Sequence, residues 1–333
     1  MNWLARPPLT LGIAFLGLAL SVACTRRSNE KSDPKAQGRS VRENVWSGKA
    51  PSCSALPATC GPSGNEDCCK SPLVPGGTYA RSYDAVDYRD SKSVATVSDF
   101  TLDKYEVTVG RFRAFVNAGG GTQAHPPEEG AGAHPKIRGS GWSSAWNAKL
   151  PADTASLKSA LKCFVHRSWT DAAGSNENKP INCLDWYTAF AFCAWDGGRL
   201  PTEAEWNYAA SGGAEQRYYP WSNPATSTAI DDSYAVYCGR TCSLQNVGSR
   251  SPKGDGKWGH SDLGGNAWEW MLDWDPVQYA VPCHDCALVK AGSYRAFRSG
   301  SNDDIAPTLR SATRHVNYPE IRTNIGARCA HTP

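Results

Sequence analysis

The stretch GRLPTEAEW, residues 198–206, decides the fold expected for this chain. Thr202 followed three residues later by Glu205 is a capping box, in which the threonine hydroxyl and the glutamate carboxylate each satisfy a free backbone N–H. The helix is expected to run to Ala210 and to stop at Gly212-Gly213, because glycine tolerates left-handed backbone angles. A helix this short is stable only when its neighbours pack on it, so the stretch predicts a short, buried helix with a well-defined N-terminus.

Two more helices are predicted from a capping residue and the apolar face behind it. Thr108 can cap a helix whose apolar side chains recur at helical spacing, at Val109, Phe112, Phe115 and Val116. Asp185 can cap another, with three side chains on one face, at Trp186, Phe190 and Cys193. Residues 97–102 are a strand candidate. We interpret the helix after Thr108 as a core element without chemistry of its own.

Residues 122–180 show no clear hydrophobic periodicity. They mix Gly, Pro, His, Trp and Lys, a composition typical of long surface loops around a site. The spacing of the histidines matches no metal motif, so we expect all three to be exposed: His125, His134 and His166. The tryptophans of this region either line a groove or fill a core: Trp142, Trp146 and Trp169.

Residues 1–23 are typical of an export signal. A positive start is followed by a short apolar run and by a small-residue cleavage site that ends at Ala23. A permanent membrane helix needs about 20 apolar residues, so a cleaved signal is favoured. Cys24 resembles the lipidated cysteine of bacterial lipoproteins, although Ser21 stands where that motif has leucine. We expect an exported protein, placed in the outer membrane or periplasm as a lipoprotein or, alternatively, secreted.

The partners suggested by charge are few. Residues 24–52 are polar and nearly free of large apolar side chains, so they are expected to form a flexible tether. The formal net charge is only +3 and no run of Lys or Arg could follow a phosphate backbone, which argues against nucleic acid. Contact with a membrane is expected through a lipid anchor at Cys24.

The chain has 13 cysteines, and 12 remain when Cys24 is set aside. An even number in an oxidising compartment predicts a disulfide framework. Residues 53–70 hold four of them and are expected to form two disulfides of open connectivity, rather than a zinc knot. Cys238 and Cys242 suggest a small local loop. Cys283 and Cys286 are interpreted as a structural disulfide, because no helix follows them to lower the pKa of a redox thiol.

The stretch at 198–206 is followed by LGGNAWEW at 263–270, and the two in this order resemble the sulfatase-modifying factor family, whose founding members are formylglycine-generating enzymes. The resemblance covers roughly Leu73 to Cys329, and 73–79 looks like the strand that opens the family's domain. It implies an α+β fold that is irregular, loop-rich and similar to C-type lectins. We place this domain at residues 71–331, after the Cys-rich segment.

The resemblance also implies specific cysteine pairs. Family members often join a cysteine at the position of Cys193 to one at that of Cys329. Apart from the resemblance, Cys163–Cys183 is the next pair that we expect. A further family disulfide joins the positions that Ala210 and Ser311 occupy here, so both of its halves are missing together.

The turn that leads to Glu269 has the layout of a calcium loop. Calcium takes about six to eight oxygen ligands from carboxylates and backbone carbonyls. The oxygens of Gly265, Ala267 and Glu269 alternate along the chain and can face one point, while Asp262 adds a carboxylate. In the family the matching positions bind structural calcium, through side chains at those of Asp262 and Glu269. The alternative is a Gly-rich turn in which Glu269 is capping or ion-paired.

The family's catalytic metal is copper(I) held by two cysteine thiolates. The matching positions here are Ala296 and Ser301, so copper is not expected, because a serine hydroxyl is a hard ligand that stays protonated near neutral pH. Trp268 and Ser293 match positions that line the family's oxygen pocket. The resemblance therefore supports the fold more strongly than the oxidase chemistry.

Three functions follow. The first is a non-catalytic binding protein for a glycan or a protein ligand, by analogy with the lectin-like fold. The second is an oxidoreductase of the same family with altered metal and O₂ chemistry. The third is a formylglycine-generating enzyme that recruits another thiol, at Cys283 or Cys286. We favour the first.

Overall fold

The computed structural model describes residues 50–239, 242–275 and 278–333. The predicted signal peptide, Cys24 and the tether as far as residue 49 lie outside the described residues. None of the helices described is long and apolar enough to cross a membrane.

The α-helices are short, and they begin at polar caps. They are α1 (Val109–Asn117), α2 (Thr154–Ala160), α3 (Trp186–Trp195) and α4 (Glu203–Ala210), with 3-10 turns at Pro51–Cys53, Ser144–Lys149, Gly213–Glu215 and Ala306–Leu309. Thr108 and Asp185 cap α1 and α3, and Thr202 with Glu205 forms the complete capping box of α4. The three predicted helices are therefore confirmed. The region 122–180 also holds α2, which begins at Asp153 and was not predicted.

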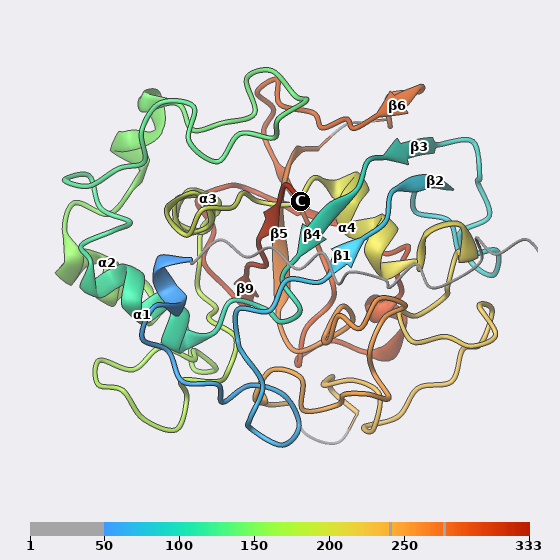
Figure 1. The fold of residues 1–333 in the computed structure, drawn as a ribbon, viewed down its shortest axis with the longest axis horizontal. Coiled ribbons are helices and arrows are strands. Elements are labelled where there is room, and N and C mark those ends of the chain that lie inside the picture. Colours follow the sequence, from blue (N-terminus) through green and yellow to red (C-terminus); the bar gives the residue numbers. More distant parts are fainter. Residues whose placement is uncertain (1–49, 240–241, 276–277) are drawn as a thin grey trace, which may run out of the picture. The chain divides into compact units, whose positions relative to one another are not determined.

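Within the described residues, ten short strands form three small sheets. One contains β1 (Leu73–Val74), β4 (Phe100–Leu102) and β10 (Ala330–His331); a second contains β2 (Gly77–Ala80), β3 (Val94–Val97) and β6 (Cys283–His284). The third has the order β8 (His315–Asn317), β7 (Arg295–Arg298), β5 (Trp268–Trp274) and β9 (Ile325–Gly326). Figure 1 shows β5 and β9 side by side near the middle of the view, with α4 close to β1 and β4. Long irregular connections surround these elements, so the predicted α+β, loop-rich fold is confirmed.

The core is aromatic and lies around α3. Side chains of α1 and α3 pack on those of β5 and β7, while α4 packs with β1, β3 and β4 in a second cluster. Trp142 and Trp169 are buried in the first cluster, and Trp146 packs against it. The tryptophans of the irregular region therefore fill the core. The prediction of exposed histidines is confirmed for His125 and His166 and wrong for His134, which is buried.

Six disulfides account for all twelve cysteines of the described residues. The four pairs that were predicted from the sequence and from the family resemblance are confirmed: Cys193–Cys329, Cys163–Cys183, Cys238–Cys242 and Cys283–Cys286. In the N-terminal segment the connectivity left open is Cys53–Cys69 with Cys60–Cys68.

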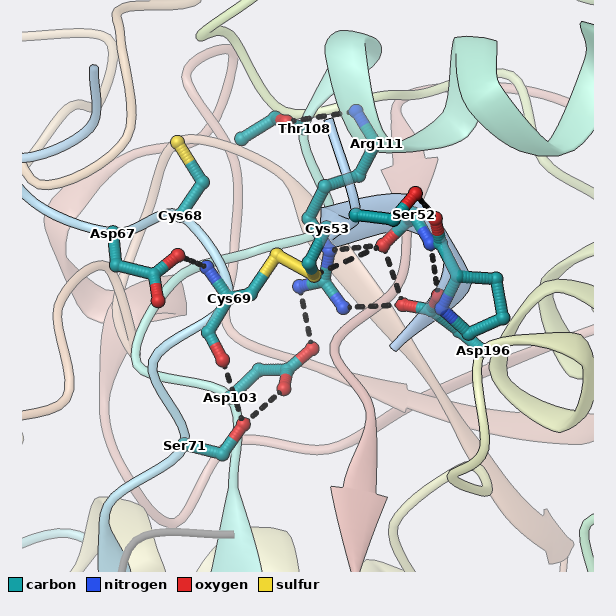
Figure 2. Close-up of a disulfide and its surroundings, with 12 residues drawn as sticks. Ser52, Cys53, Asp67, Cys68, Cys69, Ser71, Asp103, Thr108, Arg111 and Asp196 are labelled. Atoms are coloured by element: carbon teal, nitrogen blue, oxygen red, sulfur yellow. Dashed lines mark hydrogen bonds and ion pairs between the residues drawn. A yellow bond between two sulfur atoms is a disulfide. The ribbon is translucent and has the colours of Figure 1, made fainter. Parts of the chain in front are cut away.

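The N-terminal segment is fixed to the domain by buried ions. Arg111 of α1 bonds Asp103 at 2.7 Å and Asp196 at 2.8 Å, and all three side chains are almost fully buried. The backbone N–H and the hydroxyl of Ser52 donate to the same Asp196 carboxylate, at 2.8 and 2.7 Å. Figure 2 shows this network beside the Cys53–Cys69 disulfide. Because Ser52 is buried, the end of the segment expected to be a flexible tether is part of the fold.

The two positions of the missing family disulfide lie against each other. The Ser311 hydroxyl donates to the carbonyl oxygen of Ala210 at 3.0 Å, across 101 residues of chain. We expect the double change Ala210→Cys with Ser311→Cys to form a disulfide and to raise the free energy of unfolding by about 2–4 kcal/mol, because it constrains a long loop of the unfolded chain. Thiol titration and thermal unfolding measure this. Two free thiols under oxidising conditions would show that the side chains point apart.

Candidate functional site

The α4 motif builds the floor of a cavity. Arg199 bonds both oxygens of the Glu205 carboxylate, at 2.6 and 2.7 Å, and Glu205 also accepts the backbone N–H of Thr202. The Nε2 atom of His134 lies 3.4 Å from the same carboxylate. Burial by itself raises the pKa of Glu205, but Arg199 and His134 more than offset this and hold it well below its usual range. The motif at residues 198–206 therefore positions a cluster of buried ionisable side chains. Glu205 is the buried contact of His134 in this cluster.

This cavity is about 440 Å³ in volume, and its rim comes from separate loops. The Asp285 carboxylate accepts from the backbone and hydroxyl of Ser98 at 2.6 and 2.7 Å, and it pairs with Lys136 at 3.0 Å. Asp285 lies inside the small loop that the Cys283–Cys286 disulfide closes. The disulfide thus helps to hold one wall of the cavity. The volume is within the range of small-ligand pockets, about 300–1,000 Å³.

The second motif, the turn that leads into β5, is held by a buried arginine. Arg328 donates to both oxygens of Glu269, with contacts of 2.8 to 3.1 Å, and the Trp206 indole N–H donates to Glu269 at 2.6 Å. Glu106 accepts the backbone N–H of Ala267 at 2.8 Å and the side-chain amide of Asn266 at 2.8 Å. The two sequence motifs therefore meet through Trp206 and Glu269. Glu106 was not singled out from the sequence, because its partners are distant along the chain.

The predicted calcium ligands are only partly brought together. The Ser299 hydroxyl donates to the carbonyl oxygens of Asp262 and Gly265, at 3.3 and 3.2 Å, so these two oxygens lie near one point. The Glu269 carboxylate, in contrast, accepts hydrogen bonds from Arg328 and Trp206. This is the arrangement expected for the alternative in which Glu269 is ion-paired. Among the described residues no group of three or more His, Cys, Asp or Glu side chains is arranged to hold a metal. In this structure the Glu269 carboxylate is therefore bonded by Arg328 and Trp206, and calcium binding at this turn stays a prediction.

Two further carboxyl groups beside this turn, those of Asp262 and Glu106, have raised pKa values. Burial, the largest cause, raises the pKa of Asp262 to about 6, against the N–H of Gly248 and the charge of Arg328, which lower it. Burial likewise raises the pKa of Glu106 well above its usual range, and the charges of Asp262 and Glu269 add to the effect. One arginine thus faces three buried carboxyl groups.

The change Glu269→Gln distinguishes a calcium ligand at this position from an ion pair with Arg328. We expect it to lower the free energy of unfolding by about 2–3 kcal/mol, because a buried guanidinium loses its charged partner while the amide keeps one acceptor oxygen. The loss should be the same in calcium and in chelator, since the partner is Arg328. Thermal unfolding of both proteins in the two buffers measures it. A loss seen only in calcium would restore Glu269 as a metal ligand.

The two residues matched to the family's oxygen pocket lie near opposite ends of the β5–β7 pair. Trp268 begins β5 and packs its ring on Phe297 and His315, with ring centroids 4.9 and 4.8 Å away. Ser293 is exposed and precedes Arg295, which pairs with Trp274 at the far end of β5. The role of these two side chains in an oxygen pocket therefore stays a prediction.

The positions matched to the copper cysteines lie on either side of a turn. Ala296 is a fully buried core residue of β7. Ser301 is buried as well, and its hydroxyl donates to Asp304 at 2.6 Å. Cys283 and Cys286 are bonded to each other, so in this structure neither is a thiolate that could bind copper(I).

Comparison with known proteins agrees with this architecture. The family model described as "Sulfatase-modifying factor enzyme 1-like domain" matches residues 58–333. The formylglycine-generating enzyme of Streptomyces coelicolor is 30% identical over 297 residues, which cover 78% of this chain and 88% of that protein. The "Inactive C-alpha-formylglycine-generating enzyme 2" of Bos taurus is 29% identical over 288 residues, with 77% and 86% covered. Among solved structures, PvdO from Pseudomonas aeruginosa matches with a TM-score of 0.56 at 20% identity, over 80% of this chain and 95% of that one.

Fold and motifs together define a disulfide-linked, loop-rich domain that is similar to formylglycine-generating enzymes. The chain belongs to the sulfatase-modifying factor family.

Proposed function

We propose that this protein is a non-catalytic member of its family that binds a glycan or protein ligand. One observation carries the proposal: every cysteine of the described residues is in a disulfide, and the positions matched to the copper cysteines hold an alanine in the core and a hydrogen-bonded serine. The family's oxidation of cysteine depends on soft thiolate ligands for copper(I).

Similarity to a protein named inactive supports the proposal. The Bos taurus relative bears that word in its name, and its alignment covers 77% of this chain, against 78% for the Streptomyces coelicolor enzyme. The cavity beside α4 offers a binding site of suitable size, with polar groups from loops on a disulfide-braced frame. A rigid frame that carries loops is a general way to build a binding site.

The place of action is part of the proposal. The apolar run and cleavage site of residues 1–23 and the cysteine at position 24 support an exported lipoprotein that acts in the periplasm or at the outer membrane. The disulfides of the described residues fit an oxidising compartment.

Metal analysis of the purified full-length protein tests this proposal. We expect neither copper nor iron at a stoichiometric level. Bound copper would favour a formylglycine-generating enzyme that uses another thiol, and bound iron would favour the oxidoreductase with altered chemistry. Either metal at one equivalent would contradict a non-catalytic role.

A further inference from the structure

The domain buries several arginine side chains. Four of them, each at most 3% exposed, form an ion pair with a carboxylate: Arg111, Arg199, Arg298 and Arg328. Arg295 is just as deeply buried, with 1% of its surface exposed. Within the described residues its guanidinium makes no ion pair. A buried charge without a partner is costly, so this side chain needs an explanation.

Arg295 lies between two tryptophan rings. Its guanidinium carbon is 3.5 Å from the ring centroid of Trp186 and 3.6 Å from that of Trp274. Nη1 donates to the Leu272 carbonyl at 2.6 Å, whereas Nε has no acceptor and Nη2 donates to none of the described residues. Burial lowers the pKa of Arg295 well below its usual range. The rings stabilise the faces of the cation, but its edge keeps unused donors.

Arg81 shows that a missing carboxylate is not enough to leave donors unused. It is also buried and has no ion pair among the described residues, yet Nε, Nη1 and Nη2 each donate, to Ser93, Cys286 and Ala280. Arg295 thus has no carboxylate in contact, although Asp273 and Tyr187 act on it electrostatically, and it has an edge that the chain does not satisfy.

A polar and aromatic surface adjoins Arg295. Trp146 lies 5.8 Å from the guanidinium, and the Tyr187 phenol is within electrostatic reach of Arg295, Lys149 and Glu320. Lys149 pairs with Glu320 at 2.9 Å, and both are about half exposed. Glu320 belongs to the loop after β8, between Tyr318, which is 52% exposed, and Ile321. The Tyr318 ring contacts that of Tyr294, the residue before Arg295, with centroids 4.7 Å apart.

We propose that Arg295 anchors a docking surface for a polypeptide that presents an acidic side chain. In this interface Lys149 is the second cation, and Tyr294, Tyr318 and Ile321 form the apolar rim. The inference rests on the proposed function and selects a protein as the ligand. Arginine and the large aromatic residues are enriched at the energetic centres of protein interfaces. A carboxylate from a partner would supply the contacting anion and the acceptor that the guanidinium edge lacks.

Equilibrium binding tests the proposal with poly-L-glutamate as the probe, at about 0.15 M salt so that exposed charges are screened. Arg295→Met should weaken binding by about tenfold or more, because the buried charge is the anchor. Lys149→Gln should weaken it by about two- to threefold, as expected for a half-exposed rim charge. The matched control is Lys253→Gln, since Lys253 has the same 48% exposure as Lys149 and contacts Asp231 and Tyr234 instead. Its binding should stay within about twofold of the original protein.

Stability without ligand gives a second readout. Arg295→Met should melt at the same temperature as the original protein or higher, because an uncompensated buried charge is removed. A lower melting temperature together with unchanged binding would mean that Arg295 only packs the core. Equal losses for Lys149→Gln and Lys253→Gln would also overturn the proposal, as would tighter binding of polygalacturonate, a carboxylated glycan. Each of these results leaves the non-catalytic assignment intact, since the metal analysis tests that separately.

Discussion

Replacing Arg111 with methionine is expected to destabilise the domain by about 3–5 kcal/mol, the cost of removing one partner from a buried ion pair. Arg111 is the shared partner of Asp103 and Asp196, and Asp196 also holds Ser52 of the N-terminal segment. Two carboxylates would lose their cation at once. Urea unfolding followed by tryptophan fluorescence measures the change.

Arg113→Met is the matched control on the same helix. Arg113 pairs with Glu177, donates to carbonyl oxygens of residues 170–172 and lies over the Trp169 ring, but in a partly exposed position, so its replacement should cost about 1–2 kcal/mol, less than that of Arg111. Similar losses for the two variants would contradict the role assigned to Arg111.

The Arg111→Met loss should also depend on pH. Burial alone would raise the pKa of Asp103, but Arg111, His331 and Ser71 hold it well below its usual range. A depressed folded-state pKa contributes stability that is present above the unfolded value, about 3.9, and lost as the pH falls further. Without Arg111 the burial effect gains weight and Asp103 takes up a proton more readily. The variant should therefore lose less stability relative to the original protein near pH 4 than near pH 8.

Removing the Cys193–Cys329 disulfide, with both cysteines changed to alanine, is expected to cost about 5 kcal/mol in the chain-entropy model. The bond spans 136 residues and joins α3 to the segment just before β10, and both cysteines are fully buried. The Cys238–Cys242 disulfide closes a loop with a sequence separation of only 4, so changing both of its cysteines to alanine should cost only about 2 kcal/mol. Unfolding of the two variants under oxidising conditions gives the comparison. Equal costs would show that chain entropy does not govern the contribution of the longer bridge.

Local signals in the sequence were sufficient for much of the fold. The caps at Thr108, Asp185 and Thr202 act within one turn, so each helix start could be predicted without knowledge of tertiary contacts. The cap of α2 at Asp153 is of the same kind, and only the irregular composition around it obscured the helix.

The site depends on partners that are far apart in sequence, and there prediction was weaker. His134 was expected at the surface because its spacing to other histidines carries no motif, while its burial comes from Glu205. For Glu269 the local sequence left a calcium ligand and an ion pair as alternatives, because the bond from Arg328 to its carboxylate comes from a distant segment. The surroundings of Arg295 could not be predicted either, because only the folded structure places it between Trp186 and Trp274, which come from different segments.

The central claim, a family member without oxidase chemistry, is tested most directly by a peptide assay. The purified protein is incubated with a Cys-x-Pro-x-Arg peptide, copper, oxygen and a thiol reductant, and the peptide is then examined by mass spectrometry. A formylglycine-generating enzyme such as the Streptomyces coelicolor relative is the positive control. We expect the cysteine of the peptide to remain unconverted, because Ala296 and Ser301 offer no thiolates for copper(I). Formylglycine formed by the unmodified protein would contradict the account.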